Sequence, residues 1–177
     1  FSCPIVAGCA GLIKSKFNNY NCLQIAAQLK ATSDNIDTIA FNKQYRQQLG
    51  AGRVNLLKAV SDTSMTYIEF KDISFNDKND DILLPNETIY INGNFINFLK
   101  TGKNINAILS TKSIYVDIKS GTFTIDSIGD SDTLPNDSSP FSFSVYETVP
   151  VDQEIEFKIT YNGLGFNAYE YFSVIVN

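Results

Sequence analysis

The sequence predicts an α+β chain in two parts: a short helical region over residues 1–60, then an all-β sandwich over residues 61–177. Up to about Val60, Ala, Gly, Leu, Lys and Gln dominate, and the apolar residues recur at helical spacing. From about Ser61 onward, Thr, Ile, Phe, Tyr, Asn and Asp take over, and apolar and polar residues frequently alternate. A hydrophobic share of 44% and a charged share of 19% describe a globular protein and not a disordered tail.

The helical region opens with an apolar segment over residues 5–13, which carries no polar side chain on any face. Pro4 suits the first turn of a helix, because its missing N–H is not needed there. A helix that is apolar all round has to be enclosed on all sides. We therefore expect this helix either to self-associate with a second copy of the chain or to fold back on the sandwich.

A second helix is predicted over residues 22–32, with Asn21 as its N-cap. A loop of cap and turn residues over 32–37 follows it. A short last helix is expected over residues 54–60.

A tight backbone passage is predicted just before the last helix, where Gly50 and Gly52 bracket a single residue. Arg53 follows directly and is a candidate for an ion pair with a carboxylate that fixes the end of the helical region. An exposed pair of this kind contributes only about 0–1 kcal/mol.

Alternation in the second region is clearest over residues 154–161, where Ile155, Phe157, Ile159 and Tyr161 share one face. Further strands are expected over residues 66–75, 88–98, 105–110, 115–119, 123–125, 141–145 and 168–176. Short strands separated by turn signals suit two packed antiparallel sheets. Their number fits an immunoglobulin-like sandwich, although a jelly roll stays open. Gly93 suggests a β-bulge in its own strand, and residues 130–139 are expected to form a polar loop.

Two stretches of the helical region resemble the end of the catalytic domain of subtilisin-like serine proteases. In that family the nucleophile lies in a Gly-Thr-Ser-x-x-x-Pro-x-x-Ala-Gly stretch, and Pro4 and Ala7-Gly8 match its second half. Residues 49–55, Leu-Gly-Ala-Gly-Arg-Val-Asn, resemble the stretch that closes the same domain. The resemblance implies that residues 1–60 are the C-terminal helices of an incomplete subtilisin-like domain.

The same register implies that no catalytic residue lies in this chain, because it places the nucleophile immediately before Phe1. Ser2 falls two residues after the nucleophile position and cannot replace it. The composition agrees, since the sequence has no histidine and cannot supply a Ser-His-Asp set. Catalysis would therefore belong to the rest of the protease domain, which is the first partner that the resemblance implies.

A sandwich behind such a domain is similar to the tail modules of secreted proteases of Bacteroidetes-type bacteria, and residues 84–88 and 139–145 carry that weaker resemblance. It implies a secreted or cell-surface bacterial serine endopeptidase that acts on protein or peptide substrates. The rival hypothesis is a non-catalytic binding or adhesion module with a helical extension. An Asp motif and a His-Gly-Thr motif upstream would favour the protease.

Composition excludes several other classes of function. A net charge of −5 and a pI near 4.7 argue against nucleic acid as a partner. No stretch approaches the roughly 18 apolar residues of a membrane span, and no charged run suits a membrane surface. The three cysteines all lie within the first 22 residues without a C-x-x-C pair, which does not describe a disulfide scaffold or a zinc site.

The acidic loop over residues 76–87 is the one metal-like pattern, and calcium is the cofactor it would suit. Calcium prefers several oxygen ligands from one loop, often at alternate positions with a closing glutamate. Both possible registers are damaged: from Asn76, a lysine takes a ligand position, and from Asp77, the glutamate comes one residue early. The weak candidate ligands are Asp77, Asn79, Asp81 and Glu87. A connection without a metal is the favoured interpretation.

Overall fold

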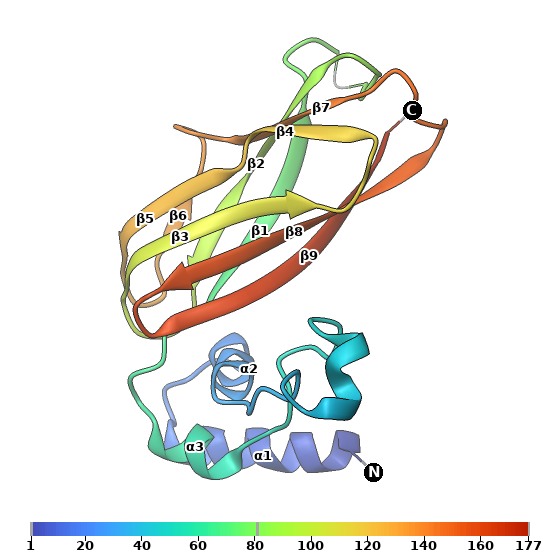
Figure 1. The fold of residues 1–177 in the computed structure, drawn as a ribbon. Coiled ribbons are helices and arrows are strands. Elements are labelled where there is room, and N and C mark those ends of the chain that lie inside the picture. The colour runs from blue at the N-terminus through green and yellow to red at the C-terminus, as the bar shows by residue number, and fades with distance from the viewer. Residues whose placement is uncertain (1, 81, 177) are drawn as a thin grey trace.

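The computed structural model describes residues 2–80 and 82–176, and places the helices at one end of two packed antiparallel sheets (Figure 1). The helical elements are α1 (Ser2–Lys16), α2 (Cys22–Ala31), the 3-10 helix η1 (Ala40–Tyr45) and α3 (Leu56–Ser61). The strands are β1 (Ile68–Asn76), β2 (Thr88–Asn97), β3 (Gly102–Thr111), β4 (Val116–Ser120), β5 (Thr122–Ile128), β6 (Thr133–Pro135), β7 (Phe141–Val145), β8 (Gln153–Gly163) and β9 (Phe166–Val176). The predicted order, helices and then two packed sheets, is confirmed.

The second helix begins where the sequence predicts. Asn21 Oδ1 accepts a hydrogen bond from the Gln24 backbone N–H at 2.9 Å, and Gln24 Oε1 accepts one from the Asn21 N–H at 3.0 Å. Such a reciprocal capping box satisfies two backbone donors that a helix start otherwise leaves unpaired. At the other end, the Thr32 hydroxyl donates to the Gln28 carbonyl at 2.7 Å. Asn21 is therefore confirmed as the N-cap of α2.

The first helix is longer than predicted and is not enclosed. It spans Ser2–Lys16, and only Cys9 and Ile13 are buried, whereas Ile5 is 63% and Leu12 is 55% exposed. It packs against α2 and α3 and lies on the side of α2 away from the sandwich (Figure 1). The expectation that it folds back on the sandwich is therefore wrong, because α2 occupies that place. Association with a second copy stays a prediction.

The two sheets hold the core between them. One has the order β1-β2-β7-β4, with β6 also paired to β2, and the other has the order β5-β3-β8-β9. The four alternating residues of β8 that the sequence places on one face are all buried in this core. Phe95 of β2 is fully buried at its centre, with the rings of Phe70 and Phe123 at 4.7 and 5.0 Å. The alternation in the sequence thus marks the inward face correctly.

Two details of the strands differ from the prediction. The polar segment 130–139 contains the short strand β6, which pairs with β2 although its sequence has no apolar alternation. The bulge lies in β1, where the register shifts between Lys71 and Ser74, and not in the strand that carries Gly93. A Cβ on Gly93 would lie 2.6 Å from Phe70 Cζ. The glycine therefore serves the close approach of the bulged partner strand.

The helices are joined to the sandwich by polar contacts. Lys30 of α2 forms an ion pair with Glu69 of β1, with Nζ and Oε1 2.8 Å apart. On β9, an edge strand of the other sheet, the Tyr169 hydroxyl donates to the Gly50 carbonyl at 3.1 Å. Both the second helix and the segment before α3 are thus held against the sandwich.

Candidate functional site

Asp34 is joined to Arg53 and Asn55 by a set of polar contacts, which we call the polar lock. Asp34 and Arg53 exchange two backbone hydrogen bonds, N to O, at 2.8 and 3.0 Å. Their side chains also pair, with Arg53 Nη2 3.0 Å from Asp34 Oδ2, while Asn55 Nδ2 donates to Asp34 Oδ1 at 3.0 Å. The hydrogen bonds from Asn55 and then Arg53 hold the pKa of Asp34 below its usual range. The predicted ion pair of Arg53 is therefore confirmed.

Gly52 is required for this lock, and its replacement by alanine is expected to lower the free energy of unfolding by about 1–3 kcal/mol. Its φ is +109°, and a Cβ there would collide with the carbonyl oxygen of Asp34. Chemical unfolding followed by circular dichroism measures the effect. Gly11→Ala in α1 is the matched control, because a Cβ at Gly11 meets nothing within 4 Å and alanine favours a helix. Equal losses in the two variants would contradict the assignment.

The two residues that the sequence resemblance relates to a nucleophile, Ser2 and Pro4, lie at the start of α1. Ser2 is the first residue of α1 and is exposed. The expected nucleophile precedes Phe1, which lies outside the described residues. Pro4 lies in the first turn of α1.

The calcium candidates lie in the connection between β1 and β2. Asp77 Oδ1 accepts from the Asn79 backbone N–H at 2.9 Å, and Glu87 Oε2 accepts from the Leu84 N–H at 3.1 Å. Asp81 lies outside the described residues. Among residues 2–80 and 82–176, no three His, Cys, Asp or Glu side chains are grouped closely enough to hold a metal ion. The carboxylates that are described stabilise turns of the loop, and calcium stays the weaker alternative to a connection without a metal.

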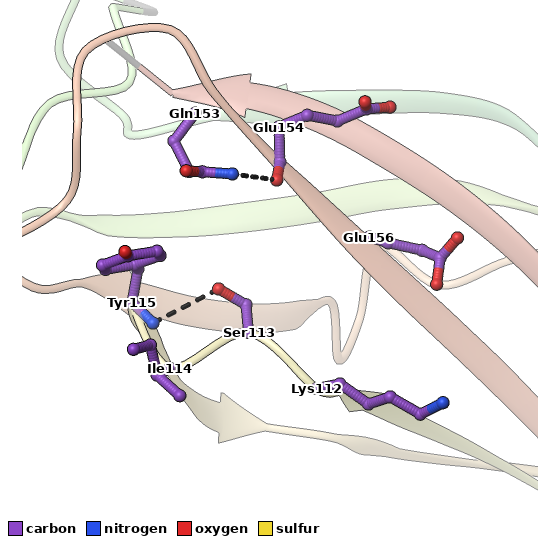
Figure 2. A pocket seen from close by; sticks show the side chains of 7 residues that line it. All are labelled: Lys112, Ser113, Ile114, Tyr115, Gln153, Glu154 and Glu156. Carbon is purple, nitrogen blue, oxygen red and sulfur yellow. Dashed lines mark hydrogen bonds between the residues drawn. The ribbon is translucent and has the colours of Figure 1, made fainter.

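An open hollow lies between the β3–β4 loop and the start of β8 (Figure 2). Its volume is about 350 Å³, and it is lined by Lys112, Ser113, Ile114, Tyr115, Gln153, Glu154 and Glu156. Ser113 Oγ accepts from the Tyr115 backbone N–H at 3.2 Å, and Glu154 Oε1 accepts from the Ser173 hydroxyl at 2.6 Å. The lining thus combines two carboxylates, one ammonium group and the exposed Ile114.

Sequence reasoning missed a half-buried carboxylate on β9. Glu170 Oε1 accepts the backbone N–H of Phe70 on β1 at 2.7 Å and also accepts the hydroxyl of Tyr161 on β8. The side chain thereby links the edge strand of one sheet to the edge of the other. Burial raises the pKa of Glu170 above its usual value. No sequence pattern points to it, because its partners are distant in the chain.

A second carboxylate, Glu69, lies next to this link. It pairs with Lys30 Nζ at 2.8 Å and with Lys71 Nζ at 3.0 Å. Burial alone would raise the pKa of Glu69, but the two ammonium groups together hold it below its usual range. The two glutamates therefore join α2, β1, β8 and β9 at one place. Their partners are backbone, tyrosine and lysine groups, so the arrangement is a structural junction.

Comparison with known proteins identifies no relative: no protein-family model and no curated protein matches the sequence. In the described part of the chain, no helix is long and apolar enough to span a membrane.

Proposed function

We propose that the chain is the C-terminal part of a secreted bacterial serine endopeptidase of the subtilisin-like type. Residues 1–60 are then the last helices of the catalytic domain, and residues 61–177 are an appended immunoglobulin-like sandwich. In the whole enzyme a serine attacks the peptide carbonyl, histidine acts as the base, and aspartate orients the histidine. This chain has no histidine, so its contribution is structural.

The observation that carries the proposal is the combination of the family pattern with the partial cover of α1. The helix carries Pro4 in its first turn, and its apolar residues Ile5 and Leu12 are 63% and 55% exposed. A central helix of an α/β domain would have this surface if the sheet that packs on it were supplied by other residues. The start of such a helix also stabilises the negative charge that develops when its neighbouring serine attacks.

Sheet order supports the immunoglobulin-like part of the proposal. The order β5-β3-β8-β9 corresponds to strands C′-C-F-G of that architecture, and β1-β2-β7 corresponds to A-B-E. The fourth strand of the first sheet, β4, takes the place of strand D but comes before β5 in the chain. The proposed module is thus a variant in which one edge strand has a different position in the sequence.

The proposal is tested with a fluorophosphonate probe, which labels activated serines, on the full-length gene product. Mass spectrometry is expected to find the label on a serine immediately before Phe1. The variant with alanine at that serine, and the chain 1–177 alone, are the controls and should stay unlabelled. An unlabelled full-length protein with no Ser-His-Asp set upstream would contradict the protease assignment.

That outcome would favour the second candidate, a non-catalytic binding or adhesion module. The observation on its side is that the sandwich has a continuous core of its own, drawn from both sheets, and a hollow beside the β3–β4 loop (Figure 2). Such a module needs no residues from outside residues 61–177 to bind a ligand.

A further inference from the structure

Between α2 and α3 in the chain, residues 39–47 include η1 and expose several apolar side chains; we call this segment the apolar tip. Phe41 and Tyr45 of η1 are 90% and 49% exposed, and Ile39, which directly precedes η1, is 47% exposed. The segment is fixed at its base, because the Gln47 backbone N–H donates to Asp37 Oδ2 at 3.0 Å. A fixed surface segment that exposes three large apolar side chains within seven positions marks a site of interaction.

Basic side chains surround the base of this tip. Lys43 and Arg46 belong to the same segment and are exposed. Lys158 of β8 reaches the segment, with its Nζ donating to Gln47 Oε1 at 2.7 Å. Lys112, which follows β3 and lines the hollow, lies near Lys158, and its charge helps to lower the pKa of that group.

The electrostatics agree with this placement. Burial and then the nearby charges of Lys112 and Arg46 lower the pKa of Lys158. The carboxylates that face the same groups are Asp37 and Glu156. Four basic groups against two acidic ones leave a local positive excess of two on a chain whose net charge is −5.

We propose that η1 and this basic rim form a docking surface for an anionic lipid bilayer, with Phe41 entering the boundary between headgroups and acyl chains. An aromatic and aliphatic tip gains from contact with hydrocarbon, while lysine and arginine at its base attract anionic headgroups. A nucleic acid would offer bases for Phe41 and Tyr45 to stack on but no apolar medium for Ile39. This surface consists only of residues of this chain, and in a complete protease domain the tip would have to stay uncovered.

The sequence contains no run of basic residues that would suit a membrane surface. The basic rim is instead assembled from separate segments of the chain. The basic residues come from positions 43, 46, 112 and 158, and only the packing of η1 against β8 gathers them.

Vesicle flotation of the chain tests the proposal, with phosphatidylcholine vesicles compared with vesicles of phosphatidylcholine and phosphatidylserine. Binding is expected only to the mixed vesicles and should fall with added salt. Phe41→Ser is expected to weaken this binding about tenfold or more, as the loss of a buried aromatic side chain implies. Arg46→Gln is expected to weaken it about fivefold.

Matched controls separate docking from general effects. Leu164→Ser changes an equally exposed apolar residue, 83% exposed at the β8–β9 turn, and should leave vesicle binding unchanged. Lys103→Gln removes a charge from an exposed position outside the rim and should have little effect. Equal losses for Phe41→Ser and Leu164→Ser, or no binding to mixed vesicles, would overturn the proposal. The proposal would also be overturned, in favour of an acidic protein partner, if the chain bound soluble polyglutamate as tightly as the mixed vesicles and Phe41→Ser did not weaken that binding.

Discussion

Phe95→Ala is expected to lower the free energy of unfolding by about 3–5 kcal/mol, the usual cost of removing a fully buried aromatic ring. Phe95 has no exposed surface, and its ring lies 4.7 Å from that of Phe70 and 5.0 Å from that of Phe123. Phe70 belongs to one sheet and Phe123 to the other. The substitution therefore opens a cavity between the sheets that neither sheet can fill without moving.

Urea unfolding measures this loss, and tyrosine fluorescence is a suitable signal because the chain has no tryptophan. Phe41→Ala is the matched control, since it makes the same chemical change at a side chain that is 90% exposed. The control should change the free energy of unfolding by no more than about 0.5 kcal/mol. A loss of less than about 1 kcal/mol for Phe95→Ala would mean that the two sheets do not pack around this ring.

The parts of the fold that depend on neighbouring residues could be predicted from the sequence. The hydrogen bonds of a helix cap join residues three positions apart, as Asn21 and Gln24 do, so the start of α2 is visible in the local sequence. Alternation likewise acts over two positions, so residues 155–161 of β8 reveal their buried face.

Features that depend on distant partners could not be predicted. The three-residue strand β6 exists because β2 offers it an edge, and its own sequence is that of a polar loop. The exposure of α1 depends on which elements pack beside it, and the apolar sequence of the helix does not identify those elements. The acidic loop over residues 76–87 could not be assigned from its sequence for another reason. Oxygen-rich side chains that accept hydrogen bonds from their own turns have the same sequence pattern as metal ligands.

Glu170→Ala is expected to cost about 1–3 kcal/mol for each donor that it leaves without an acceptor. Those donors are the backbone N–H of Phe70 and the hydroxyl of Tyr161. Urea unfolding measures the loss. Glu156→Ala, on the exposed face of the adjacent strand β8, is the control and should change stability little. Similar values for the two variants would show that Glu170 does not join the sheet edges.

The pH dependence of stability gives a sharper test, because Glu170 and Glu69 act in opposite directions. The native pKa of Glu170 is raised above 4.5 by burial, so its native state binds the proton more tightly than the unfolded chain does. Its contribution is present below pH 4.5 and is lost as the pH rises through the native pKa. The pKa of Glu69 is lowered, so its contribution is present above 4.5 and is lost as the pH falls through its native pKa.

Glu170→Gln keeps an acceptor for Phe70 but cannot ionise. The wild-type chain is therefore expected to lose stability relative to this variant as the pH rises above 4.5, the ordinary value for the carboxyl group. Below 4.5 the two chains should follow the same course, because both retain Glu69 and its two lysines. Urea unfolding of both proteins over this range separates the two windows. Parallel curves above pH 4.5 would mean that the carboxyl group of Glu170 is no harder to ionise in the folded protein than in the unfolded chain, and that its burial does not outweigh the hydrogen bonds it accepts from Phe70 and Tyr161.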